Sequence, residues 1–161
     1  EVEPFLVVMP QEESYLQDPS ASRFGQALME DLIPWVDAHY PTCVERGCRS
    51  IGGLSRGAAW AVRLGFEHWQ TFGAIGAHSL PPFFGDPNRL PTWLAAIPDD
   101  QYPRIYLDIG SRDPYLSPAA EFEDLLTHLR VAHFWRLNPG GHDDAYWSGQ
   151  IEEYLRWYAG N

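Results

Sequence analysis

The segment Arg49–Trp60 constrains the fold of this chain more than any other part of the sequence. A short run of residues ends at Leu54, the pattern Gly-x-Ser-x-Gly occupies residues 53–57, and an alanine-rich stretch follows. This order predicts a strand, a tight turn at Ser55 and a helix, because flanking glycines permit the close backbone approach that such a turn needs. A helix that begins after Ser55 also directs its free N–H groups at the serine. An ordinary glycine-rich turn gives the same pattern, so the rest of the chain must decide between the two.

The remainder of the chain alternates between predicted strands and predicted helices. Apolar runs predict strands at residues 5–9, 72–77, 104–109 and 133–137, in addition to the strand that ends at residue 54. Apolar residues at helical spacing predict helices at residues 22–40, with a kink at Pro34, and at residues 58–66, 117–129 and 151–158. This alternation predicts an α/β fold in which helices cover both faces of a parallel sheet.

Residues 79–103 form the longest stretch without a predicted strand or helix. This segment contains several prolines together with Phe83, Phe84 and Trp93, and we expect it to be a loop-rich, lid-like insertion. The chain of 161 residues is long enough for one domain with its own core, so residues 1–161 are interpreted as a single domain.

The composition disfavours some classes of function. The net charge of −11 argues against binding to nucleic acids and to anionic membrane surfaces, which require basic patches. No apolar run is long enough to span a membrane, and no signal peptide is recognised. Cys43 and Cys48 either form a disulfide across a short loop, which favours an extracytoplasmic or secreted protein over a cytoplasmic one, or stay as two thiols. The sequence leaves both possibilities open.

Three loops are expected to meet at one edge of the sheet, because ligands bind beyond the carboxyl ends of parallel strands. They are the turn at Ser55, residues 110–115 and residues 138–146. A serine hydroxyl becomes nucleophilic only beside a base that is oriented by an acid. The candidate acid is Asp113, which follows a strand, and the candidate base is His142, which follows a Pro-Gly-Gly turn. The order Ser55, Asp113, His142 is that of α/β-hydrolases.

Other acids and histidines are weaker candidates. Asp108 lies within a strand and is predicted to form buried hydrogen bonds instead, and Asp86 and Asp143 are further alternatives for the acid. His78 and Ser79 follow a strand and either line the pocket or have a structural role. Four histidines are expected at helix ends or on the surface, namely His39, His68, His128 and His133. Histidines scattered in this way predict no metal site, and no cofactor is implied.

Four segments resemble the esterase D group of α/β-hydrolases, which includes feruloyl and acetylxylan esterases, S-formylglutathione hydrolases, siderophore esterases and mycolyl transferases. The segments are Ile51–Gly57, Phe72–Ser79, Ile105–Asp113 and Gly141–Trp147. The resemblance covers nearly the whole chain and implies a three-layer α/β-hydrolase fold with a mainly parallel sheet, of which this chain is the C-terminal part. It also implies that Ser55 is the nucleophile, Asp113 the acid and His142 the base. The backbone N–H of Arg56 is, by the same resemblance, one donor to the oxyanion.

Two features depart from that group. Arg56 stands where many relatives have Met or Gln, and its charge either faces an anionic part of the substrate or forms a surface ion pair, which is the interpretation favoured here. The group also has further strands upstream, one of them between the strand at residues 5–9 and the strand before Ser55, and a His-Gly loop that supplies the second oxyanion N–H. We therefore expect an N-terminally truncated domain, completed by an N-terminal segment of the same protein or by a second copy of the chain. Direct pairing of residues 5–9 with the strand before Ser55 would contradict this expectation.

The three residues and the resemblance together predict a serine carboxylic ester hydrolase that works through an acyl-enzyme. Its substrate is expected to be a small-molecule or glycan-linked ester, such as an acetyl or feruloyl ester, because the aromatic lid suits such groups. Acyl transfer to an alcohol by the same nucleophile and a non-catalytic binding or assembly module are the alternatives. The residues predicted to contact the substrate are His78, Ser79, Trp60, Phe83, Phe84 and Trp147.

Overall fold

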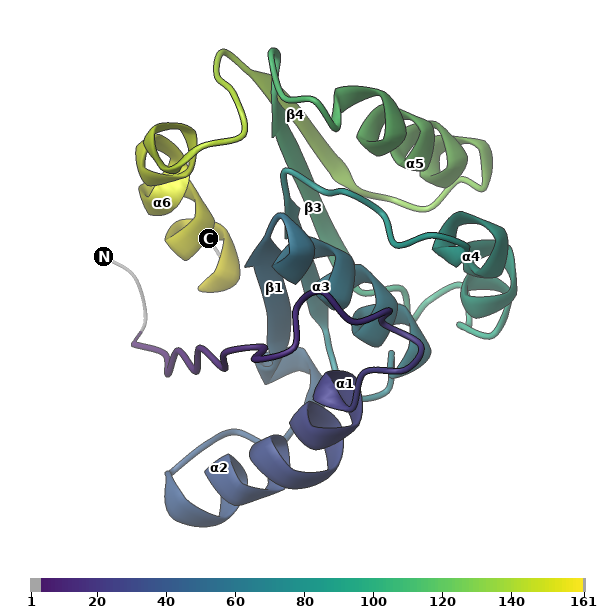
Figure 1. Cartoon of the computed structure of the whole chain (residues 1–161). Coiled ribbons are helices and arrows are strands. Elements are labelled where there is room, and N and C mark those ends of the chain that lie inside the picture. The colour runs from purple at the N-terminus through teal and green to yellow at the C-terminus, as the bar shows by residue number, and fades with distance from the viewer. Residues whose placement is uncertain (1–3, 161) are drawn as a thin grey trace.

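A parallel sheet of four strands in the order β1-β2-β3-β4 forms the centre of the computed structural model, which describes residues 4–160 (Figure 1). The strands are β1 (Ser50–Leu54), β2 (Ala74–His78), β3 (Arg104–Gly110) and β4 (Phe134–Asn138). The helices are α1 (Phe24–Ala27), α2 (Ile33–His39), α3 (Arg56–Glu67), α4 (Asp86–Ala95), α5 (Leu116–His128) and α6 (Asp144–Tyr158), with a π-helical turn at Leu28–Leu32 and a 3-10 turn at Arg46–Cys48. One helix separates each pair of neighbouring strands, as parallel pairing requires.

Helices cover both faces of the sheet (Figure 1): α3, α4 and α5 lie on one face and α6 lies on the other. Because successive side chains of a strand point to opposite faces, β2 contributes Ile75 and Ala77 to the core beneath α3, and Ala74 to the smaller core beneath α6. Every residue of β2 is buried. The predicted layers of helix, sheet and helix are confirmed.

Glycines let the helices approach the sheet closely. On the α3 face, a Cβ on Gly65 would lie 2.6 Å from side-chain atoms of Ile75. On the α6 face, the hydroxyl of Tyr158 occupies the space that a Cβ on Gly52 of β1 or on Gly76 of β2 would fill. The last turn of α6 is therefore seated directly on the strand that leads into the predicted turn.

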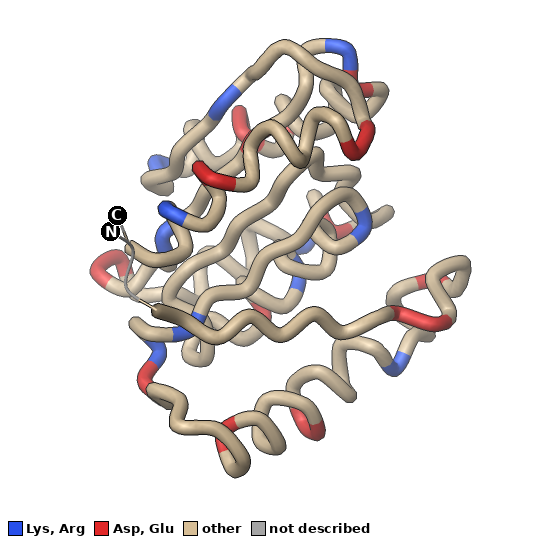
Figure 2. Tube along the Cα trace, turned by 90° about the vertical axis from the view of Figure 1, so that its left-hand side faces the viewer, with Lys and Arg blue, Asp and Glu red and all other residues tan. Residues whose placement is uncertain are grey.

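Residues 5–9 do not form a buried strand, contrary to the prediction. They are extended but lie outside any sheet, and their exposed fractions run from 43% at Phe5 to 87% at Met9. In Figure 2 they are the uncharged length of tube that follows the grey N-terminus. A strand needs hydrogen-bonding neighbours, and within residues 4–160 β1 is paired only on its β2 side. The direct pairing that would have contradicted a gap in the sheet is thus not seen in this part of the chain.

Residues 79–103 contain a helix where the sequence analysis expects a loop-rich lid. α4 has Pro87 in its first turn, where the missing N–H costs little because first-turn N–H groups have no acceptor within the helix. Leu90, Leu94 and Ile97 have the spacing of one helical face, are at most 4% exposed and lie in the main core. The prolines of the segment concealed this periodicity.

Two features of the helices also differ from the expectation. The kink predicted at Pro34 takes the form of the π-helical turn at Leu28–Leu32, since proline has no N–H for the usual α-helical bond. α6 begins well before its predicted start. The Asp143 carboxylate caps it there by accepting a hydrogen bond of 2.9 Å from the N–H of Tyr146.

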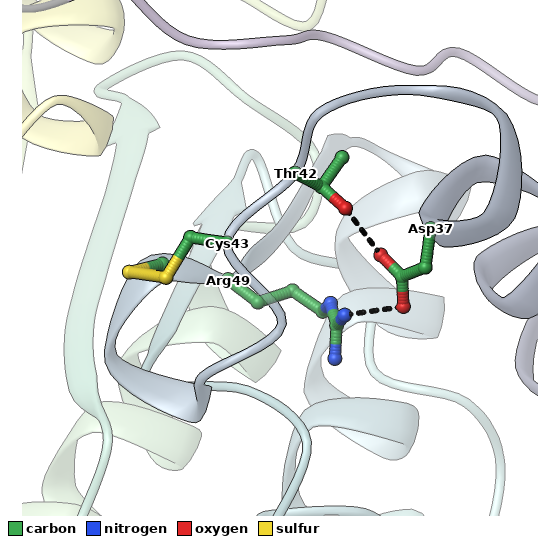
Figure 3. The surroundings of a disulfide bond; sticks show 5 residues. Asp37, Thr42, Cys43 and Arg49 are labelled. Atoms are coloured by element: carbon green, nitrogen blue, oxygen red, sulfur yellow. Dashed lines mark hydrogen bonds and ion pairs between the residues drawn. A yellow bond between two sulfur atoms is a disulfide. The ribbon is translucent and has the colours of Figure 1, made fainter.

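The loop between α2 and β1 contains a disulfide between Cys43 and Cys48, one of the two possibilities that the sequence leaves open (Figure 3). Beside it, Asp37 near the end of α2 accepts hydrogen bonds from Thr42 Oγ1 at 2.9 Å and from Arg49 Nη2 at 2.8 Å. These contacts fix the course of the chain immediately before β1.

Candidate active site

Ser55 lies in a strained turn between β1 and α3. Its φ of 53° and ψ of −121° fall outside the regions that residues with a side chain usually occupy. Its N–H donates to the His78 carbonyl at 2.9 Å, and its own carbonyl accepts from the N–H of Ala58 at 2.8 Å. A Cβ on Gly53 would lie 2.6 Å from the carbonyl oxygen of Gly57, so the crossing of β1 and α3 requires this glycine.

The hydroxyl of Ser55 is the first member of a chain of three hydrogen-bonded side chains. Nε2 of His142 lies 2.8 Å from Ser55 Oγ, and Nδ1 of the same ring lies 2.8 Å from Asp113 Oδ2. The Asp113 side chain is fully buried, and its second oxygen accepts the N–H of Tyr115 at 2.9 Å. When Nδ1–H donates to the carboxylate, Nε2 is free to take the proton of the serine hydroxyl. The arrangement can therefore convert an alcohol into a nucleophile.

The loops that follow β3 and β4 are bonded to each other. The N–H of Ser111 donates to the Asn138 carbonyl at 2.8 Å, and the N–H of Arg112 donates to the Gly140 carbonyl at 2.8 Å. These two bonds hold the carboxylate and the imidazole together, although 29 residues separate them along the chain.

Two aromatic side chains flank the imidazole of His142. Tyr115 and Trp147 are both T-shaped to it, each with its ring centroid 5.0 Å away. Trp147 Nε1 also donates to Ser79 Oγ at 3.0 Å, and Ser79 is fully buried with a φ of 53°. Of the residues predicted to contact a substrate, Trp147 therefore lies beside the imidazole and Ser79 holds it there.

The guanidinium of Arg56 forms an ion pair with Glu12. Its Nε and Nη2 donate to the two carboxylate oxygens at 2.6 Å and 2.8 Å, and Trp60 Nε1 donates to the same carboxylate at 2.9 Å. The hydrogen bond from Arg56 is the main reason why the pKa of Glu12 lies below its usual value. The chain itself thus neutralises the charge of Arg56, which agrees with the ion-pair interpretation.

The other four residues predicted to contact a substrate are either buried or fully exposed to solvent. His78 is 2% exposed, and its ring nitrogens lie 2.5 Å from Asp108 Oδ1 and 2.9 Å from the hydroxyl of Tyr158, so its role is structural. Phe83 and Trp60 are buried in the main core. The side chain of Phe84 is fully exposed to solvent. Large aromatic residues suit a core as well as a pocket, and the sequence pattern does not separate the two.

Asp108 has the buried hydrogen-bonding role expected for it. The residue is 1% exposed, and Oδ2 accepts the hydroxyls of Tyr146 at 2.6 Å and of Tyr154 at 2.8 Å. Burial, with Asp108 as the next cause, raises the pKa of both tyrosines far above the usual value. These partners were not predicted from the sequence, and neither were the contacts of Tyr115 and Glu12, because no spacing rule links a helix tyrosine or a loop acid to a distant polar group.

Between residues 4 and 160, no group of three or more His, Cys, Asp or Glu side chains is arranged to hold a metal ion. The same stretch contains no helix that is long and apolar enough to cross a membrane.

Known proteins resemble the chain over most of its length. The family model described as putative esterase matches residues 2–158. The iron(III) enterobactin esterase of Escherichia coli (strain K12) is 28% identical in an alignment of 145 residues that covers 85% of this chain and 36% of that protein. The chain therefore spans about a third of this relative.

Solved structures share the fold. An S-formylglutathione hydrolase from Staphylococcus aureus matches with a TM-score of 0.73 at 21% identity, over 85% of this chain and 61% of that one. A ferulic acid esterase matches with a TM-score of 0.72 at 23% identity, over 83% of this chain and 60% of that one. The predicted fold class, part of an α/β-hydrolase, is confirmed.

Proposed function

The chain belongs to the esterase family, and on this premise we propose that the protein containing it is a carboxylic ester hydrolase with Ser55 as nucleophile, His142 as general base and Asp113 as the residue that orients the imidazole. The observation that carries the proposal is the unbroken chain of hydrogen bonds from Ser55 Oγ to Asp113 Oδ2, with both distances 2.8 Å. Similarity to the esterase family over residues 2–158 supports ester chemistry at this serine.

The proposed reaction uses the same three side chains twice. Ser55 Oγ attacks the ester carbonyl while His142 Nε2 takes its proton, and the Asp113 carboxylate stabilises the imidazolium that results. The oxyanion forms at the start of α3, where the N–H of Arg56 has no acceptor within the helix. His142 then returns the proton to the leaving alcohol, and water releases the acid from the acyl-enzyme by the reverse sequence of proton transfers.

A fluorophosphonate probe tests the nucleophile directly. Mass spectrometry should find the probe on Ser55, with no labelling in Ser55→Ala and strongly slowed labelling in His142→Ala. Ser50→Ala, which removes the serine at the start of β1, serves as the control and should label normally. A folded protein that turns over no ester and takes no probe at Ser55 would contradict the proposal.

We also propose that the sheet of the complete enzyme continues past β1, on the side where β1 has no partner strand within residues 4–160. The added polypeptide is an N-terminal segment of the same protein or a second copy of the chain. Support comes from the exposure of residues 5–9 and from the pairing of β1 on one side only within residues 4–160. The chain also matches only 61% of a related hydrolase structure. The addition supplies a second oxyanion N–H, a group whose loss lowers turnover by about 10²–10³.

Amide hydrogen exchange and turnover test this completion. The 161-residue chain is compared with a longer form of the protein, and sedimentation velocity identifies any dimer. We expect slower exchange in β1 and at residues 5–9, and turnover at least about 10²-fold higher, in the completed form. Equal exchange and equal turnover in a monomeric short chain would rule out the completion.

Aromatic or sugar-linked esters are the proposed substrates. Tyr115 and Trp147 beside His142 offer flat apolar surfaces to such groups, and a ferulic acid esterase is among the similar structures. Methyl ferulate, acetylated xylan and S-formylglutathione, assayed side by side, test this choice. A clear preference for S-formylglutathione would contradict it, and transfer of the acyl group to an added alcohol rather than to water would identify an acyltransferase.

We also propose that the protein lies outside the cytoplasm. The disulfide between Cys43 and Cys48 supports this, because cytoplasmic thiols are normally kept reduced. Alkylation of free thiols in freshly lysed cells should leave both cysteines unmodified, and their complete alkylation would contradict an oxidising compartment.

A further inference from the structure

A second buried carboxylate lies behind the proposed active site and connects its parts. Asp108 is 1% exposed, and its oxygens accept from Nδ1 of His78 at 2.5 Å, from the hydroxyl of Tyr146 at 2.6 Å and from the hydroxyl of Tyr154 at 2.8 Å. A buried carboxylate is stable only with such a set of donors, so removing one donor leaves it partly unsatisfied.

Tyr146 links this carboxylate to the loop that carries His142. Its ring fills the space that a Cβ on Gly140 would occupy, so the turn that delivers the imidazole rests on that ring. Its N–H also donates at 2.9 Å to Asp143, the residue that follows His142. Tyr146 therefore contacts the chain on both sides of His142, through its ring at Gly140 and through its N–H at the Asp143 carboxylate.

His78 links the same carboxylate to the turn at Ser55. The carbonyl of His78 accepts the N–H of Ser55 at 2.9 Å, and the N–H of Ser79 donates to the backbone carbonyl of Asp108 at 2.8 Å. With the proton on Nδ1 donated to Asp108, Nε2 of His78 accepts the hydroxyl of Tyr158 at 2.9 Å. Asp108 is thus connected both to the turn at Ser55 and to the loop that carries His142.

We propose that Asp108 is a positioning residue that holds His142 in line with Ser55 by fixing the ring of Tyr146. This inference rests on the proposed function, and it adds a carboxylate that lies outside the hydrogen-bonded chain of Ser55, His142 and Asp113. Its effect belongs to the chemical step rather than to substrate binding, because a displaced base alters proton transfer and leaves the substrate surface in place.

Two tyrosine variants separate positioning from stability. Tyr146→Phe and Tyr154→Phe each remove one hydroxyl that donates to the same oxygen, Asp108 Oδ2. Of these two tyrosines, Tyr146 has its ring against Gly140 in the turn before His142. Rates are expressed per active site, counted by titration with a fluorophosphonate, so that unfolded protein does not enter the comparison.

We expect Tyr146→Phe to lower kcat about 10-fold with KM unchanged, since small misplacements of a catalytic group cost up to about 10² in rate. Tyr154→Phe should change kcat less than about twofold, even though both variants unfold at lower urea concentration. Asp108→Asn should reproduce the kcat loss of Tyr146→Phe. Equal kcat in wild type and Tyr146→Phe, or equal losses in both tyrosine variants, would overturn the positioning role.

Measurements on the wild-type protein in the same experiment distinguish a failure of this inference from a failure of the proposed ester hydrolase function. Labelling of Ser55 and ester turnover by wild type, combined with an unaffected Tyr146→Phe, overturns the role of Asp108 alone. Absence of labelling and turnover in wild type overturns the ester hydrolase proposal, and the positioning role with it.

Discussion

The two glycines that flank Ser55 differ in their surroundings, and alanine substitutions should separate them. A Cβ on Gly53 would lie 2.6 Å from the carbonyl oxygen of Gly57, well inside ordinary contact, and the obstacle is helix backbone that cannot rotate away. Gly53→Ala must therefore push β1 away from α3, at a cost of about 1–3 kcal/mol or more. A Cβ on Gly57 itself would meet nothing within 4 Å among the described residues. Since Gly57 is helical, Gly57→Ala should be neutral or stabilise the protein by up to about 1 kcal/mol.

Urea unfolding followed by tryptophan fluorescence measures both effects. The midpoint should fall in Gly53→Ala and hold or rise in Gly57→Ala, at unchanged dependence on urea concentration. Labelling of Ser55 by a fluorophosphonate should slow in Gly53→Ala, because the same displacement opens the turn. Similar losses in the two variants, or a wild-type midpoint in Gly53→Ala, would refute the steric reasoning.

Three further predictions concern contacts outside the turn. Asp86→Ala should destabilise the protein by about 3–5 kcal/mol in urea, because it leaves the buried guanidinium of Arg63, now 2.6 Å from the carboxylate, without a partner; a loss below about 1 kcal/mol would contradict this. The lowered pKa of Glu12 means that its stabilising effect is complete above the usual value of 4.5 and is lost as the pH falls through the lowered folded value. Glu12→Gln should therefore be less stable than wild type at pH 7, and the difference in stability should shrink as the pH falls below 4.5. Reduction of the disulfide between Cys43 and Cys48, which are 5 residues apart, should cost about 2 kcal/mol, whereas the double Ser variant should not respond to the reductant.

Strands buried on both faces were predictable because their sequences are continuous apolar runs. The run at residues 104–109 corresponds to β3, and the run at residues 72–77 overlaps β2. The strand predicted from the same pattern at residues 5–9 is not formed. An apolar run indicates that a segment favours burial, but it does not identify the partner that would bury it. The helix α4 was not predicted, because the prolines around it indicate a loop although Leu90 and Leu94 have helical spacing.

The approach of Ser55, Asp113 and His142 could be anticipated from topology, because loops at the carboxyl ends of parallel strands meet at one edge of the sheet. Contacts that depend on how deeply a side chain is buried could not be anticipated in this way. Tyr154 lies in the helix predicted at residues 151–158, whereas Tyr146 lies in the loop predicted at residues 138–146, and only the packing of α6 on the sheet brings both hydroxyls to a buried carboxylate.

The serine hydroxyl and the imidazole beside it are 87 residues apart along the chain. On the proposed mechanism, the ribosome therefore synthesises the turn at Ser55 long before His142, and the serine remains an ordinary alcohol until β4 has joined the sheet. The proposed mechanism thus implies that a nascent chain or a fragment that ends before His142 lacks an activated serine.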